Sequence, residues 1–195
     1  MANITDYRTI SYFDVETTSL NPNKGEIIQV CILTEDRDGN LSEWSTKVRP
    51  RLKEGTYDRS ALRINNFNPK EYIDAPIFED VADEIIEKLR WGPIVAHNAQ
   101  FDISFIESNL QRYTTWKPGA RTDFDNRTYR LGYPVIDTVS LAYLLVPSER
   151  QNLMALREHF GLTTSGGHEA VKDVYDTRQV FWHCLEKCLA VRENI

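Results

Sequence analysis

The order of the expected strands and helices constrains the fold of this chain more than any other feature. β-Branched and aromatic residues predict three successive strands, over residues 8–16, 25–35 and 40–49. The pair Asp38-Gly39 favours a hairpin turn between the last two of them. The rest of the chain alternates between amphipathic helices at 58–65, 74–90, 101–113, 138–146, 150–160 and 169–191 and short strands at 93–97 and 134–137. An antiparallel meander followed by parallel strands predicts an α/β fold, a mixed five-stranded sheet with helices on both faces.

Composition limits the class of protein without naming a function. The 195 residues suit one domain, which we expect to span residues 1–195. No apolar run approaches the ~20 residues of a membrane helix, and the N-terminus lacks the layout of a signal peptide, so we expect no membrane partner. The three cysteines favour free thiols in a reducing, cytoplasmic compartment over a disulfide framework or a zinc site. The net charge of −6 argues against a protein held on DNA by overall charge.

Two acidic residues end the first expected strand, in the segment Phe13-Asp14-Val15-Glu16-Thr17-Thr18. Because side chains alternate along a strand, Asp14 and Glu16 share one face and Phe13 and Val15 the other. Neighbouring carboxylates repel each other unless a cation lies between them, and divalent cations prefer oxygen ligands. Taken alone, this pair is better explained by a strand edge that faces solvent with alternating acids.

Two further segments place chemistry-bearing residues where a helix begins. The segment His97-Asn98-Ala99-Gln100-Phe101-Asp102 puts Asp102 in a first helical turn, where an acid also simply complements the helix dipole. In the segment 166–173, His168 precedes a helix that carries Asp173. At ~100° per residue the two would lie about 140° apart on one helix, so a shared site requires His168 on the Gly-Gly approach. A surface histidine is the alternative.

Together these segments supply four carboxylates and one histidine. The formal charge of Asp14, Glu16, Asp102 and Asp173 is −4, which two divalent cations would neutralise. Paired metals held by carboxylates suit phosphodiester hydrolysis, and histidine is the residue type that takes a proton from an attacking water near neutral pH.

Three motifs in order then resemble one family. FDVETTSL, HNAQFD and HEAVKD are similar to the three motifs of the DnaQ-like, or DEDDh, 3′→5′ exonucleases, which share the ribonuclease H-like fold. The resemblance extends over about residues 8–182 and includes Val135-Ile136-Asp137-Thr138 and the leucine-spaced stretch 152–161.

The resemblance implies an activity and a role for each site residue. It implies hydrolysis at the 3′ end of single-stranded nucleic acid, DNA rather than RNA, with release of nucleoside 5′-monophosphates in DNA repair or replication. Two Mg²⁺ or Mn²⁺ ions would be bound by the four carboxylates, with His168 as the general base. Thr17 and Leu20 would touch the terminal nucleotide. Asn98 would either contact the substrate or support a residue that does. A separate polymerase is a possible partner.

Several alternatives remain at this point. A sister subgroup uses tyrosine in place of the histidine, and Tyr133 and Asp137 have the matching spacing. An oligoribonuclease or RNA-trimming exoribonuclease would share every motif. A non-catalytic nucleic-acid-binding module and a metal-dependent phosphatase or nucleotide hydrolase are alternatives from other classes.

Two basic stretches depart from the acidic average. Residues 47–63 carry a net charge of +4 and residues 112–130 a net charge of +3, the latter interleaved with aromatic residues. Cationic and aromatic side chains together suit stacking against a single strand. We therefore expect the stretch 112–130 to guide a single-stranded 3′ end, with an ordinary solvated loop as the alternative.

Overall fold

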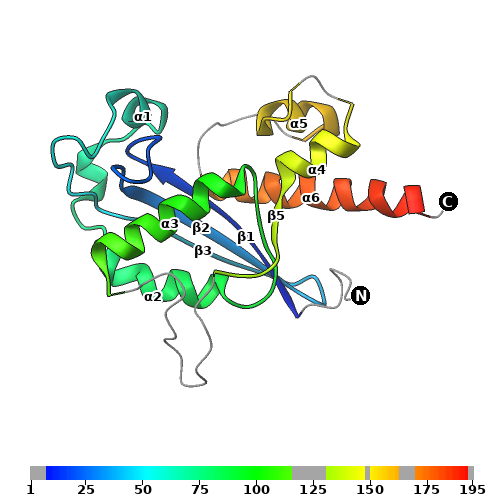
Figure 1. Ribbon diagram of the computed structural model, residues 1–195, viewed down its shortest axis with the longest axis horizontal. Helices are drawn as coiled ribbons and strands as arrows, with labels where there is room; N and C mark the ends of the chain where they lie inside the picture. Colours follow the sequence, from blue (N-terminus) through cyan, green and yellow to red (C-terminus); the bar gives the residue numbers. More distant parts are fainter. Residues whose placement is uncertain (1–7, 116–130, 148–149, 163–169, 193–195) are drawn as a thin grey trace.

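A five-stranded sheet with the strand order β3-β2-β1-β4-β5 organises the chain (Figure 1). The computed structural model describes residues 8–115, 131–147, 150–162 and 170–192. The strands are β1 (Thr9–Thr17), β2 (Ile27–Asp36), β3 (Leu41–Lys47), β4 (Ile94–Ala96) and β5 (Val135–Asp137). The first three pair antiparallel, whereas β4 and β5 join parallel to β1 and to each other. The predicted mixed sheet is therefore confirmed.

Six α-helices and one 3-10 helix surround the sheet in the described part of the chain. They are α1 (Arg59–Ile64), η2 (Pro69–Tyr72), α2 (Phe78–Leu89), α3 (Ala99–Tyr113), α4 (Thr138–Leu145), α5 (Leu153–Phe160) and α6 (Ala170–Arg192). The start expected for α2 at residue 74 is wrong. Ile77 is still extended, and its backbone N–H donates to Asp80 Oδ2 at 3.3 Å, so the helix begins at Phe78. The helix expected over 101–113 starts two residues earlier, at Ala99, and Asn98 just before it takes a left-handed conformation with φ of 67°.

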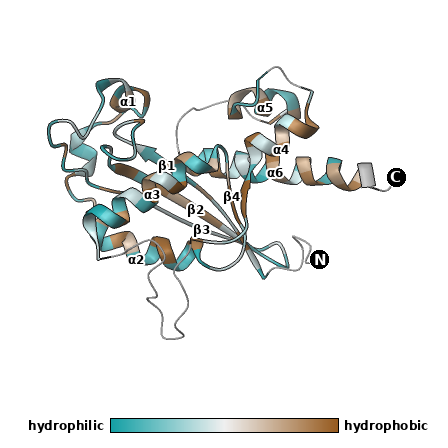
Figure 2. Ribbon diagram, viewed as in Figure 1, coloured by the Kyte–Doolittle hydropathy of each residue, from teal (hydrophilic) through white to brown (hydrophobic). Residues whose placement is uncertain are grey.

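The alternation along β1 divides the core into two layers. Phe13 and Val15 pack with residues of α2 and α3, whereas Ile10 and Tyr12 pack with residues of α6. Figure 1 shows α3 and α6 on opposite faces of the sheet, and Figure 2 shows hydrophobic residues along β2, the neighbour of the central strand β1. Asp14 and Glu16 have the parity of Tyr12, so β1 presents them on the face that α6 covers.

The helices α4 and α5 pack against α6 rather than against the sheet. Buried Ala142 and Val146 meet Leu156 of α5 and Val180 and Cys184 of α6. This packing brings the beginning of α6 and the body of α5 together behind the end of β1. Among the helices of the described residues, none is both long and apolar enough to cross a lipid bilayer.

Candidate active site

Three carboxylates converge where β1 ends and α6 begins. Asp14, Glu16 and Asp173 each offer a carboxylate oxygen, and these oxygens all lie within 4.8 Å of one another. The strand places Asp14 and Glu16 on one face, and the first turn of α6 carries Asp173 against that face. The structure thus brings Asp173 together with Asp14 and Glu16, which lie far from it in the sequence.

Asp102 lies beside this group and is held by the backbone of β1. It stands in the first turn of α3 with 2 % of its surface exposed, and its Oδ1 accepts a hydrogen bond from the Val15 N–H at 3.0 Å. All four carboxylates line one pocket of about 270 Å³. Oδ1 of Asp102 therefore accepts a hydrogen bond from β1, and Asp102 lines the same pocket as Asp14.

Burial and mutual repulsion disfavour the ionised form of these acids. Burial raises the pKa of Asp14 well above its usual range, and the charges of Asp102, Glu16 and Asp173 raise it further. Burial, followed by the charge of Asp173, raises the pKa of Glu16 to about 7. Burial also raises the pKa of Asp102. Within the described residues, no hydrogen-bond donor reaches the carboxylate of Asp14 or Glu16.

This donor set fits a divalent cation. The ligand atoms are hard carboxylate oxygens that converge on a small volume, which suits Mg²⁺, Mn²⁺ or Ca²⁺ rather than a metal that prefers thiolate or imidazole. A bound cation would also supply the positive charge that the raised pKa values indicate is missing. The residues that would hold it are Asp14, Glu16 and Asp173, with Asp102 alongside.

The predicted substrate residues divide into two groups. Thr17 and Leu20 line the pocket; Thr17 is buried and donates its hydroxyl to Ser19 O at 2.7 Å, whereas the Leu20 side chain is 77 % exposed. Asn98 lies outside the lining and is exposed, and its backbone N–H donates to Asp137 Oδ1 at 3.0 Å. Of the three, Leu20 is the one that offers an exposed apolar side chain at the pocket.

Sequence reasoning missed His97, which lines the pocket. Its Nδ1 lies 2.9 Å from Thr138 Oγ1, and the Thr138 hydroxyl donates to Ala96 O at 3.2 Å. Burial lowers the pKa of His97 to about 4, so the ring is neutral at neutral pH. Its place in HNAQFD, directly after a buried strand and near Asp102, was the available signal. His168 falls in the segment 163–169, outside the described residues.

The helix α1 forms a wall of the pocket that no sequence motif indicates. Ala61, Ile64 and Asn65 line the pocket, and Asn65 Nδ2 donates to Thr17 O at 2.9 Å. This hydrogen bond fastens the end of α1 to the end of β1. The exposed Arg59 and Arg63 lie on the same short helix.

The basic stretch 47–63 is only partly available to a substrate. Lys47 pairs with Glu71 at 2.5 Å, and Arg49 donates to Ile73 O at 2.7 Å. Arg51 pairs with Glu79. These three cations fasten the stretch to the body of the protein, whereas Lys53, Arg59 and Arg63 are exposed. In the second stretch, residues 116–130 lie outside the described residues.

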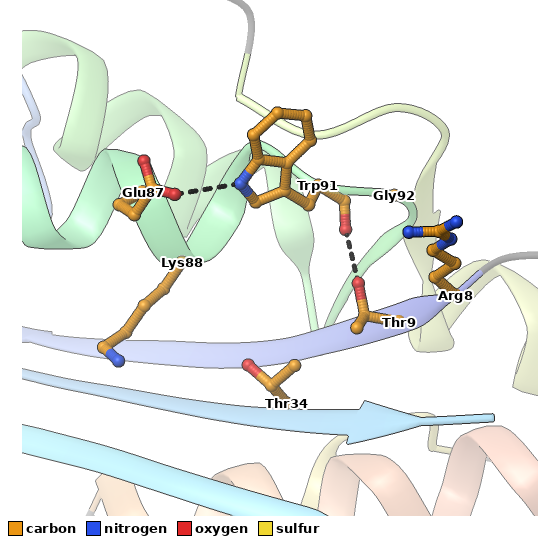
Figure 3. A pocket seen from close by; sticks show the side chains of 7 residues that line it. All are labelled: Arg8, Thr9, Thr34, Glu87, Lys88, Trp91 and Gly92. Carbon is orange, nitrogen blue, oxygen red and sulfur yellow. Dashed lines mark hydrogen bonds between the residues drawn. The ribbon is translucent and has the colours of Figure 1, made fainter. Parts of the chain in front are cut away.

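A larger pocket, of about 570 Å³, lies at the opposite end of β1 (Figure 3). Its lining consists of Arg8, Thr9, Thr34, Glu87, Lys88, Trp91 and Gly92. The indole of Trp91 donates to Glu87 Oε1 at 3.0 Å, and Thr9 Oγ1 donates to Trp91 O at 2.9 Å. Glu87 is the one carboxylate in its lining, and the potential metal ligands found among the described residues lie in the smaller pocket, which is therefore the candidate active site.

The tyrosine alternative gains no support from the geometry. Tyr133 is 76 % exposed, and neither Tyr133 nor Asp137 lines the acidic pocket. Asp137 instead caps α4 by accepting from the Val139 N–H at 2.9 Å.

Comparison with known proteins agrees with this arrangement. The model of the RNase_T exonuclease family matches residues 11–181. The chain is 26% identical over 172 residues to the DNA polymerase III subunit epsilon of Treponema pallidum (strain Nichols), which covers 87% of this chain and 73% of that protein. It is 28% identical over 176 residues to the 3′-5′ exonuclease DinG of Bacillus subtilis (strain 168), covering 89% of this chain but only 17% of that protein.

A solved structure shares the fold. E. coli exonuclease I in complex with a dT13 oligonucleotide superposes with a TM-score of 0.71 at 18% identity, over 92% of this chain and 41% of that one. The chain therefore spans less than half the length of two of these three proteins. The ribonuclease H-like fold and the predicted class of hydrolase are both confirmed. From residue 11 to residue 181, this chain belongs to the RNase_T exonuclease family.

Proposed function

We propose that this chain is a metal-dependent 3′→5′ exonuclease that shortens single-stranded nucleic acid, DNA in preference to RNA, and releases nucleoside 5′-monophosphates. The observation that carries the proposal is the convergence of Asp14, Glu16 and Asp173, beside Asp102, in one pocket. Membership of the exonuclease family supports the activity. The polymerase subunit among its relatives and the dT13 complex of its structural neighbour favour DNA.

The four carboxylates would hold the cations and so define where the scissile phosphate lies. Two divalent cations, Mg²⁺ or Mn²⁺, would supply an activated water and stabilise the charge that develops on phosphorus and on the leaving 3′ oxygen. His168 would take the proton of the attacking water as the new oxygen–phosphorus bond forms and the bond between phosphorus and the 3′ oxygen of the preceding nucleotide breaks. His97 is unsuited to that role, because its Nδ1 engages Thr138 and its pKa is lowered to about 4.

The pocket wall would orient the strand end. Leu20 offers an exposed apolar surface next to the acids, which suits contact with the terminal nucleotide. Thr17, fixed by its hydrogen bond to Ser19 O, would hold the turn that carries Leu20. The exposed Arg59 and Arg63 on α1 lie beside this wall and would attract the phosphates of the incoming strand.

One assay tests the proposal. DNA and RNA oligomers with a 5′ label are incubated with Mg²⁺, Mn²⁺ or EDTA, and the products are resolved as a ladder. We expect shortening from the 3′ end that needs metal and proceeds faster on DNA. A preference for RNA would favour the RNA-trimming alternative. Binding without shortening would favour a non-catalytic module, and phosphate released from a mononucleotide would favour a phosphatase.

The relatives also suggest the setting in which the activity is used. A polymerase III subunit among them favours proofreading beside a separate polymerase. A direct test compares shortening of a primer end that is mismatched with one that is paired. Preference for the mismatched end supports proofreading, and equal rates contradict it.

A further inference from the structure

A buried guanidinium lies directly behind the acidic cluster. Arg157 of α5 is 5% exposed, and its Nε donates to Asp176 Oδ2 at 2.5 Å. Its Nη2 donates to Oδ1 of Asp173. Asp173 and Asp176 are three residues apart on α6, so they lie on one face of that helix and a single guanidinium reaches both.

The fold builds this contact through the packing of two helices. Asn152 caps α5 by accepting from the Ala155 N–H at 2.9 Å, which sets where the helix starts. Leu156 then packs against Val180 and Cys184 of α6. Arg157, the next residue, is thereby directed at the first turns of α6, where Asp173 stands.

Asp173 needs such support, because its neighbours repel it. Its carboxylate approaches those of Asp14 and Glu16 within 4.8 Å. An acid in the first turn of a helix that is partly open to solvent could relieve this repulsion by rotating outward. The hydrogen bond from Arg157 engages Oδ1, while Oδ2 makes no hydrogen bond within the described residues.

The second acid prevents the guanidinium from repelling a metal. Asp176 is 3% exposed and pairs with Arg157, so the two charges cancel. The formal charge of −4 on Asp14, Glu16, Asp102 and Asp173 therefore remains available to cations. A bare arginine at the same place would reduce it.

We propose that Arg157 is a positioning residue which, together with Asp176, holds Asp173 toward Asp14 and Glu16 and so raises the affinity of the site for divalent cations. The inference rests on the proposed function only in treating the acidic cluster as a metal site. If the guanidinium instead competed with the cation, removing Arg157 would raise the affinity of the site for divalent cations.

The test measures Mn²⁺ binding to the full chain without substrate, through the electron paramagnetic resonance signal of free Mn²⁺. The double variant Arg157→Met/Asp176→Asn removes the support and leaves no buried unpaired charge. We expect its Kd for Mn²⁺ to rise about 10–100-fold, the usual cost of losing a group that orients a metal ligand. Arg157→Lys should give a smaller, several-fold rise, because an ammonium lacks the fork that reaches both acids.

A matched control uses a second arginine–carboxylate pair that involves α6 and is half-buried. Arg178 pairs with Glu35 at 2.5 Å, away from the acidic pocket. The double variant Arg178→Met/Glu35→Gln should bind Mn²⁺ as the unmodified protein does. Thermal unfolding checks that each variant is folded.

Unchanged or tighter Mn²⁺ binding by a folded Arg157 variant would overturn the inference, and tighter binding would identify Arg157 as a competitor. If the double variant does not fold, the Kd of Arg157→Lys for Mn²⁺ decides instead: a rise supports the inference, and an unchanged or lower value overturns it. A second readout is shortening of DNA at increasing Mn²⁺, where we expect kcat of the Arg157 variants to recover at saturation. Failure of the proposed function is distinguishable, because Mn²⁺ affinity could still depend on Arg157 in a protein that shortens no nucleic acid.

Discussion

Buried carboxylates occur at both ends of the β1–β2 hairpin, and the two ends treat them differently. Glu35, near the end of β2, is 5% exposed. It accepts hydrogen bonds from Tyr12 Oη at 2.8 Å, from Trp182 Nε1 at 3.0 Å and from the guanidinium of Arg178. Burial pushes the pKa of Glu35 upward, but these donors outweigh it, and the pKa lies below its ordinary value.

At the other end, Asp14 and Glu16 have acids for neighbours. Their pKa values are raised by burial first and by the surrounding carboxylates next. Burial is therefore not what separates the two ends of the hairpin; hydrogen-bond donors are. Hydrogen bonds within the protein offset the burial of Glu35, whereas no donor among the described residues does so for Asp14 and Glu16, and a bound cation would supply the positive charge that they lack. A deficit of this kind marks a functional site better than pocket volume does.

Asp14→Asn should give the largest effect, and it acts on activity. Losing one metal-binding carboxylate removes several kcal/mol of transition-state stabilisation, so we expect turnover on a labelled oligomer to fall on the order of 10³-fold or more. The metal-free protein should unfold at the same or a higher temperature, because one repelling charge has gone. If the variant keeps its activity, or unfolds at a markedly lower temperature, Asp14 contributes to stability as Glu35 does, and the difference between the two ends is contradicted.

His168→Ala should come next, with a loss of turnover of about 10²-fold or more, the usual contribution of a general base. Mn²⁺ affinity should change little, because the carboxylates remain. Tyr133→Phe is the matched control and should retain activity. The reverse result, with Tyr133→Phe inactive and His168→Ala active, would contradict the assignment of the base.

Glu35→Gln should affect stability rather than catalysis. It replaces a charged acceptor of three side chains, and we expect a loss of about 2 kcal/mol in the free energy of unfolding, measured with urea. The metal dependence of activity should stay as in the unmodified protein. A change in Mn²⁺ affinity would mean that the two ends are coupled.

The smallest effect is the pH dependence of the metal-free protein. The pKa of Glu16 is raised from 4.5 to about 7, so its contribution to stability is present at low pH and is lost as pH rises through 7. In EDTA we expect the free energy of unfolding to fall by about 1 kcal/mol more between pH 6 and pH 8 in the unmodified protein than in Glu16→Gln. Equal slopes would show that Glu16 does not titrate in this range.

Local patterns predicted the parts of the site that lie within single segments. Alternation along the first strand placed Asp14 and Glu16 on one face, and the start of a helix placed Asp102 in a first turn, as the structure has them. The start of α2 could not be read in this way, because Asp74-Ala75-Pro76 resembles a helix start while the backbone turns helical only after Ile77.

Contacts between segments could not be predicted. In the sequence, Arg49 and Arg51 count as cations that a substrate could meet. In the structure, Arg49 donates to Ile73 O and Arg51 pairs with Glu79. His97 belongs to a motif that the sequence displays, yet its burial and its contact with Thr138 depend on how α4 follows β5. Charge and residue type are local properties, whereas the availability of a side chain depends on its neighbours in space.

By itself, the sequence determined the order of the elements and the two faces of β1, because both follow from periodicity along the chain, and the resemblance of its three motifs to those of one family singled out the four acids. Only the tertiary structure decided that Asp173 meets Asp14 and Glu16, that α1 forms a wall of the pocket, and that Arg157 stands behind Asp173. The physical reason is that electrostatic interactions and burial act over a few ångströms in space, between residues that the sequence separates by tens of positions.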